Sequence, residues 1–374
     1  MTTVSAVKTT TYAVIMPLAI LSAVFASYWY AFGGARNVHP FDPYHPHWQT
    51  VVSAKKAELA AKIPQEWLLS QTVIDDARSR RSIAGDFLDS LLDPRNRDIT
   101  TREPAEIVHD IASGNLSSVD VVTAFCKRAS YIHQISPAFL EIGFDLALAR
   151  ARELDEYFNT HGQTVGPLHG LPITLKDHFH IKGLETSFGY VEWIGTFQGK
   201  KGTGKEKNVE SELIRQLISV GAVPIAKITL MSYLLEGPLG ARLSCKHLEA
   251  VQSALVVGVM GPSISALRLV FKSLMETRPW EHDPSVLPIP WRSDQEVPPD
   301  AILSFGFMEN DGVVAPHPPI ARALEIASSA VKNKDHSSLP GTPPLMLPTP
   351  YMGPLHVAMV ARTCTAHSNL RMNQ

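Results

Sequence analysis

A strand–helix–strand pattern in the middle of the chain limits the fold more than any other feature. The short alternating run 173–176 follows Gly170-Leu171-Pro172 and predicts a strand. Apolar residues at helical spacing predict a helix over 209–218 that stops at Gly221, and the run 222–226 predicts a second, buried strand. A unit of this length is the crossover of a parallel sheet, so we expect an α/β core.

Three amphipathic helices are predicted before this unit. The first starts at Thr100, which has capping-box spacing to Glu103, and ends at Ser113-Gly114. The second starts at Ser117, and the third follows Asp145. The predicted apolar side of the third helix carries Leu146, Ala149 and Leu154. These apolar sides are expected to face a common core.

Composition excludes several classes of protein. The 374 residues include 34 basic and 36 acidic side chains, and a net charge of −2 offers no positive field for nucleic acid, so we expect no nucleic-acid partner. The three cysteines are far apart and suit neither a disulfide framework nor a zinc knuckle. Proline is frequent, at 28 residues, and crowds the C-terminal third, where we expect short elements and loops.

Near the N-terminus, the apolar run 12–32 is long enough to cross a bilayer. It predicts a membrane helix and hence a membrane-associated protein; a cleaved signal peptide and a buried helix, with a cytoplasmic location, are the alternatives. Downstream, 38–48 holds His39, Asp42, His45 and His47, but the interleaved prolines keep this stretch extended. We therefore expect no metal site, and no cofactor.

A glycine- and lysine-rich stretch, 199–206, nearly matches a phosphate-binding loop. Its last position holds Glu206 where such loops carry a hydroxyl, and a carboxylate there would repel phosphate. A basic surface loop is the better interpretation, and nucleotide binding is the least favoured function.

Lys176 is the candidate catalytic residue. A lysine at a strand terminus is usually solvated. Here a turn rich in glycine and proline, Gly166–Pro172, brings Lys176 and Asp177 to the end of a buried strand, where α/β proteins place their sites. A desolvated lysine can lose its proton near neutral pH and act as a general base.

The segment Gly166–Asp177, with the sequence GPLHGLPITLKD, resembles the first catalytic segment of the amidase signature family, in particular its fungal acetamidase-like branch. The resemblance continues through 118–128, 147–151 and 221–227. It extends from about residue 60 to 335. It implies a mixed central β-sheet flanked by helices, and hydrolysis of small carboxamides to acid and ammonia.

Members of this family use a nucleophilic serine, a bridging serine and a lysine, with backbone N–H groups holding the oxyanion. The resemblance assigns the lysine to Lys176 and implies that burial keeps it neutral. The glycine-rich stretches that hold both serines in the family are absent here, and the sequence passes from family-like residues at Glu236 to later family segments after Gly240. An internal deletion near 237–243 is therefore expected.

No other serine replaces the missing pair. The nearest in sequence lack the flanking glycines of an exposed nucleophile, and we expect them to be caps or loop hydroxyls. They are Ser232, Ser244, Ser253 and Ser263. The leading interpretation is an amidase acting on a small-molecule amide and requiring no cofactor; the alternative is an amidase-like remnant that binds a ligand or partner without catalysis.

The predicted organisation has three parts. An N-terminal segment, 1–36, carries the apolar helix. An amidase domain, 60–335, contains the internal deletion, and a proline-rich irregular tail covers 336–374.

Overall fold

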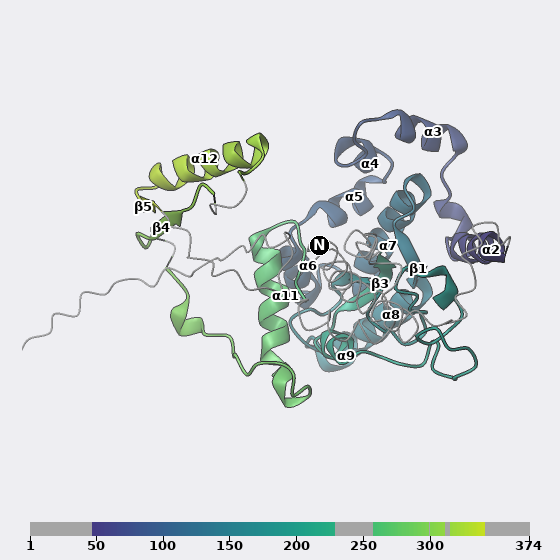
Figure 1. Cartoon of the computed structure of the whole chain (residues 1–374). Coiled ribbons are helices and arrows are strands. Elements are labelled where there is room, and N and C mark those ends of the chain that lie inside the picture. The colour runs from purple at the N-terminus through teal and green to yellow at the C-terminus, as the bar shows by residue number, and fades with distance from the viewer. Residues whose placement is uncertain (1–46, 229–256, 299, 311–314, 341–374) are drawn as a thin grey trace, which may run out of the picture. The chain divides into compact units, whose positions relative to one another are not determined.

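The computed structural model describes residues 47–228, 257–298, 300–310 and 315–340. The chain forms two compact units, one ending at Trp291 and the other beginning at Arg292 (Figure 1). The predicted membrane helix and the predicted deletion near 237–243 lie outside the described residues. The predicted domain boundaries stay a prediction.

The first unit is built on a three-stranded sheet in the order β1-β3-β2. Its strands are β1 (Phe139–Ile142), β2 (Pro172–Lys176) and β3 (Val223–Ile228). The central strand β3 runs parallel to β2 and antiparallel to β1. Helix α9 (Glu212–Ser219) connects the two parallel strands. This arrangement confirms the predicted strand–helix–strand unit and the mixed α/β class.

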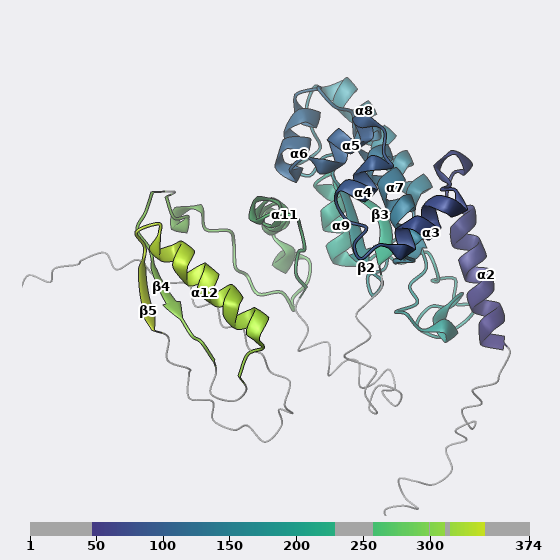
Figure 2. The same ribbon diagram turned by 90° about the horizontal axis from the view of Figure 1, so that it is seen from above.

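Helices surround this sheet (Figure 2). Their bounds are α2 (His47–Ala61), α3 (Gln71–Ser79), α4 (Asp86–Ser90), α5 (Pro94–Thr101), α6 (Pro104–Ala112), α7 (Ser118–Ile135), α8 (Phe144–His161) and α11 (Ile264–Glu276). Short 3₁₀ turns lie at η1 (Gln65–Trp67), η2 (Val191–Trp193) and η5 (Pro279–Glu281). Helices α7 and α8 pack against each other and against β3, so the central strand is covered by helices.

The start of α7 agrees with the sequence. Ser117 is its N-cap, and its side-chain oxygen accepts a hydrogen bond from the Asp120 backbone N–H at 3.0 Å. The Asp155 carboxylate of α8 accepts two more, from the backbone N–H groups of Ser118 at 2.6 Å and Val119 at 3.0 Å. The first turn of α7 is thus capped both by its own serine and by the neighbouring helix.

Two helix predictions were wrong in detail. Thr100 does not start α6; it lies at the end of α5, where its hydroxyl donates to the Asn96 carbonyl, and α6 begins at Pro104 because proline suits the first helical position. The buried side of α8 is also rotated from the predicted one, since Leu146 and Ala149 are exposed. The side chains that face the core are Phe144, Ala147, Ala151 and Leu154, a closer fit to helical spacing.

Two apolar clusters form the core of the first unit. One joins α2, α4, α7, β1, α8 and β3, and the other joins α5, α6, α7, β2 and α9. Helix α11 packs against the second cluster through Leu269, Val270 and Leu274. Apolar packing therefore covers β3 in the first cluster and β2 in the second.

The second unit contains β4 (Ser304–Phe307), α12 (Pro318–Lys332) and β5 (Ser337–Pro340), preceded by the 3₁₀ turn η6 (Ser293–Gln295). Strands β4 and β5 are parallel and α12 joins them. The sequence pattern did not indicate α12, and β5 falls within the predicted irregular tail.

Among the helices that the structure describes, none has both the length and the apolar character needed to span a bilayer. The run 12–32 is not among them, so its membrane association stays a prediction.

Candidate active site

The turn that leads into β2 is fixed by backbone contacts with the end of α9. Leu168 N–H donates to the Val220 carbonyl, and Gly170 N–H to the Gly221 carbonyl, both at 2.9 Å. Gly170 has φ +76°, and a Cβ there would lie 2.6 Å from the Ser118 hydroxyl oxygen. Only glycine satisfies both the backbone angle and the space, so this turn sets where β2 begins.

Lys176 is the last residue of β2 and pairs in register with Ile228, at the end of β3. Because β2 and β3 are parallel, their carboxyl ends meet at one edge of the sheet, the usual place for a site in an α/β fold. The Lys176 side chain is half-buried, whereas Asp177 directly after it is fully buried. The structure thus places Lys176 at the predicted strand end; its catalytic role stays a prediction.

The fully buried lysine beside this position is Lys227, on β3. Its side chain has no exposed surface, and its ammonium nitrogen lies 2.7 Å from a carboxylate oxygen of the equally buried Asp177. Burial lowers the pKa of Lys227, and the negative charge of Asp177 opposes this shift only in part.

Lys227 was not singled out from the sequence. The available signal was a lysine inside the apolar run 223–228, because a strand buried on both faces holds a charge only when that charge is paired. The partner, however, could not be read from this run alone, since Asp177 is fifty residues earlier in the chain.

Histidine and aromatic rings line the segment that follows Lys176. His178 lies 4.0 Å from the Phe179 ring and 5.9 Å from the Phe188 ring, measured between ring centroids. Burial lowers the pKa of both His178 and His180, so these imidazoles are neutral at physiological pH. The two imidazoles therefore add no positive charge beside Lys176 at this pH.

Among the candidate serines, the structure describes only Ser263. It is the N-cap of α11: its oxygen accepts from the Ala266 backbone N–H at 3.1 Å, and its hydroxyl donates to Glu103 at 2.5 Å. This confirms the expected capping role. Ser232, Ser244 and Ser253 lie outside the described residues.

The glycine-rich loop 199–206 is closed by hydrogen bonds to one of its own residues, Glu206. The Glu206 carboxylate accepts hydrogen bonds from the Thr203 backbone N–H at 2.7 Å and from the Thr203 hydroxyl at 3.2 Å. The next helix along the chain, α9, begins only at Glu212, whereas the loop of a phosphate site leads directly into a helix N-terminus. The loop is better described as a surface turn.

Within the described ranges, no three His, Cys, Asp or Glu side chains converge as metal ligands. Of the four candidate ligands near the N-terminus, His39, Asp42 and His45 are outside these ranges, and His47 begins α2.

The chain is similar in sequence to several amidases. The amidase family model matches residues 120–236, which include Lys176 and Lys227. The acetamidases of Aspergillus oryzae and Emericella nidulans are each 31% identical to this chain over 79% of its length.

The solved structure of a fatty acid amide hydrolase superposes with a TM-score of 0.68 at 27% sequence identity, covering 82% of this chain and 65% of that one. The present chain spans 65% of the length of either acetamidase. The fold, the segment around Lys176 and the relatives agree, and the chain belongs to the amidase family.

Proposed function

We propose that this chain is an amidase for small linear carboxamides, which it converts to the carboxylic acid and ammonia, with Lys176 moving the proton. The observation that carries the proposal is the position of Lys176, which is half-buried at the carboxyl end of β2. The next residue, Asp177, is buried and forms an ion pair with Lys227 of β3. The acetamidase relatives support the substrate class, since acetamide is a small carboxamide.

In the proposed reaction Lys176 acts as a general base. Its side-chain nitrogen accepts a proton from the attacking hydroxyl, directly or through a second hydroxyl, while the carboxamide carbonyl becomes a tetrahedral oxyanion. The same proton is then delivered to the leaving nitrogen, so that ammonia departs and an acyl ester remains for water to hydrolyse. Lys176 therefore both accepts and returns one proton in each half-reaction.

A specific sequence observation favours a second candidate function, binding of a carboxamide without turnover. The 374 residues contain neither a Gly-Gly-Ser-Ser-Gly-Gly stretch nor a Gly-Gly-Ser-Ile-Arg turn. The alignment with the Aspergillus oryzae acetamidase runs over 372 positions but uses 79% of this chain, which supports an internal gap of several tens of residues. Without the nucleophile, nearly all acyl-transfer chemistry is lost even with Lys176 in place.

Ammonia release from acetamide by the purified full chain tests the first candidate. The variant Lys176→Ala is compared with Lys182→Ala, which removes an exposed lysine six residues further on. Hydrolysis by the parent chain and by Lys182→Ala, but not by Lys176→Ala, is the expected result. Equal ammonia release by all three proteins would refute the role of Lys176.

If the parent chain releases no ammonia, acetamide binding decides between the remaining outcomes. Saturation-transfer NMR that detects binding to the parent chain and its loss in Lys176→Ala supports the second candidate, and absence of binding refutes both. Sequencing the transcript across Leu235 to Leu243 adds an independent check. An in-frame insertion rich in glycine and serine would restore the nucleophile and favour the first candidate.

A further inference from the structure

The buried ion pair next to Lys176 does more than join two strands. Asp177 and Lys227 have no exposed side-chain surface, and their charged atoms are 2.7 Å apart. A buried pair of this kind is costly to desolvate, and apolar residues of similar volume often stabilise a fold as well or better. Its presence at this position therefore needs an explanation beyond stability.

Both partners also bind one short segment, 185–189. Asp177 accepts hydrogen bonds from the Ser187 backbone N–H at 3.1 Å, the Ser187 hydroxyl at 2.8 Å and the Gly189 backbone N–H at 3.4 Å. Lys227 donates to the Glu185 carbonyl at 2.5 Å and to the Thr186 hydroxyl at 2.8 Å. The pair thus fixes this segment by five hydrogen bonds in addition to its own contact.

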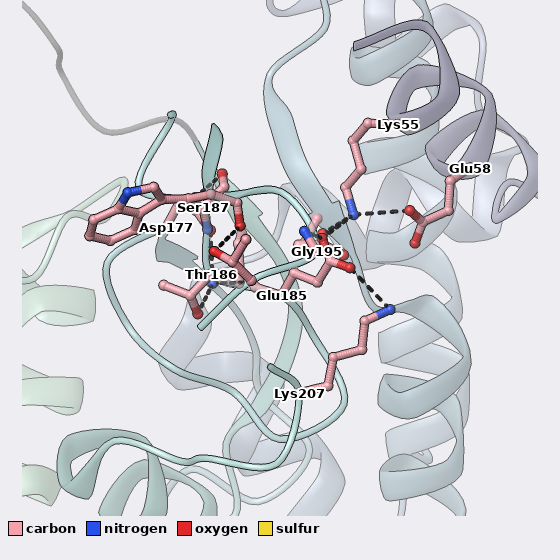
Figure 3. A network of polar contacts seen from close by, with 12 residues as sticks. Lys55, Glu58, Asp177, Glu185, Thr186, Ser187, Gly195 and Lys207 are labelled. Carbon is pink, nitrogen blue, oxygen red and sulfur yellow. Dashed lines mark hydrogen bonds and ion pairs between the residues drawn. The ribbon is translucent and has the colours of Figure 1, made fainter. Parts of the chain in front are cut away.

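The same segment is held from its other side by α2 (Figure 3). The Glu185 carboxylate binds the Lys55 ammonium at 3.2 Å, Lys207 at 3.5 Å and the Gly195 backbone N–H at 3.3 Å. Burial alone would raise the pKa of Glu185, but Lys55, Gly195 and Lys207 outweigh it and lower the pKa, so the carboxylate is charged at neutral pH.

The consequence for Lys176 follows from chain geometry. Asp177 is its direct neighbour, and the Asp177 backbone N–H donates to the Ile228 carbonyl at 3.1 Å. With the Asp177 backbone and side chain both bound, the planar peptide group that joins it to Lys176 is held in one orientation. A catalytic group gains from such restraint, because displacement of a reacting atom by a single ångström can cost orders of magnitude in rate.

We propose that Asp177 and Lys227 are positioning residues, which hold the backbone of Lys176 and the segment 185–189 in a fixed relation at the edge of the sheet. This inference rests on the proposed role of Lys176. It assigns the pair to the orientation of the general base, and neither residue to contact with substrate.

The test uses the full chain and five variants. Asp177→Asn and Lys227→Met each break the pair, and Lys227→Arg keeps the positive charge. The double variant Asp177→Leu/Lys227→Met replaces the pair by apolar groups. Lys62→Met is the matched control, because Lys62 also binds a buried carboxylate, Glu141 at 3.1 Å, and its other ion-pair partner, Glu58, is likewise outside the segment 185–189.

Two measurements do not depend on turnover. Acetylation of Lys176 by limiting acetic anhydride is quantified by peptide mass spectrometry against the exposed Lys200 of the same molecule. Amide hydrogen exchange is followed at Ser187 and Gly189, whose N–H groups donate to Asp177. Both report the local arrangement even if the parent chain releases no ammonia.

We expect exchange at Ser187 and Gly189 to become about tenfold faster or more in Asp177→Asn and Lys227→Met, with a severalfold change in the Lys176 to Lys200 labelling ratio. Lys62→Met should match the parent chain, and Lys227→Arg should lie closer to the parent than Lys227→Met. The double variant separates a positioning role of the pair from a purely stabilising one. If it is as stable as the parent chain but its Lys176 to Lys200 labelling ratio is altered, the positioning role is supported. If both its stability and its labelling ratio equal those of the parent chain, the positioning role is overturned.

Where the parent chain is active, kcat for acetamide gives a further reading. We expect kcat to fall about 100-fold in Asp177→Asn with little change in KM, as for loss of orientation. An active chain with unchanged kcat and labelling in both single variants would refute the positioning role and leave the function of Lys176 standing. If one single variant does not fold, the other single variant and Lys227→Arg decide.

Discussion

The two units of the chain contain the same local arrangement, two parallel strands joined by a helix, but bury it differently. In the first unit, α9 connects β2 to β3 and buries Ile214 and Leu217 in the apolar cluster that also holds Leu175 of β2. In the second, α12 buries none of its described side chains, and Ile320 and Ile326 are 62% and 64% exposed. The same order of elements thus forms in both units, and only the first unit packs its connecting helix into an apolar core.

This difference determines where charges can be kept away from water. Strand β3 lies between β1 and β2 and is covered by α7 and α8, so Lys227 and Asp177 are fully desolvated and their contact is not weakened by solvent. In β4 the side chains alternate between exposed and half-buried, and a charge there would remain solvated. Desolvation of this kind lowers the pKa of Lys227, a shift that a solvated lysine in β4 would not undergo.

A core truncation should break the comparison most clearly. We expect Leu154→Ala, at a side chain of α8 that is 1% exposed, to lower the free energy of unfolding of the first unit by about 3 kcal/mol. The same truncation at the exposed Ile326 of α12 should change stability by less than about 0.5 kcal/mol.

Urea unfolding followed by tryptophan fluorescence reports the first unit, because all six tryptophans, the buried Trp67 among them, belong to it. Amide exchange along α12 reports the second unit. A loss in α12 as large as the loss in the first unit would show that the Ile326 side of α12 is covered in solution.

The sequence was sufficient for features that depend on neighbours along the chain. Gly221 marked the end of α9, and Ser117 marked the start of α7, because turns and caps are formed within a few residues. Lys176 was placed correctly at a strand end for the same reason, since its turn and strand are continuous in the chain.

Features that depend on distant residues were missed. The buried side of α8 is set by what packs against it, including the β-sheet, and the sequence-based choice of Leu146 was wrong. The partner of Lys227 is fifty residues away, and the segment that the pair holds is a loop without a periodic pattern. The Asp177–Lys227 pair and the segment that it holds could therefore be identified only from the structure, in which β2 and β3 lie side by side.

Helix capping should give a smaller difference between the units. Ser117→Ala removes the side-chain acceptor of α7 and should lower the unfolding free energy of the first unit by about 1 kcal/mol. The control Ser113→Ala, at an exposed position just after α6, should have almost no effect. Denaturant midpoints at equal slope measure both changes.

The corresponding position of α12 is His317, whose side chain makes no capping hydrogen bond. His317→Ser should therefore slow amide exchange in the first turn of α12. No loss of stability in Ser117→Ala would mean that the two hydrogen bonds accepted by Asp155 are sufficient to cap α7.

The smallest expected effect is a loss of folding stability at acid pH. We expect it in the first unit, where the imidazole of His169 is buried. His169 is 1% exposed, its Nδ1 accepts from the Val165 backbone N–H at 2.9 Å, and burial lowers its pKa. Between this lowered pKa and about 6.5, the value in the unfolded chain, the unfolded state binds more protons. The contribution of His169 to stability should therefore be fully present above about pH 6.5 and be lost as the pH falls through the folded-state pKa.

His169→Gln should reduce the slope of the unfolding free energy against pH. The control His161→Gln, at an exposed histidine, should leave this slope unchanged. Equal slopes in the parent chain and both variants would contradict the role of His169.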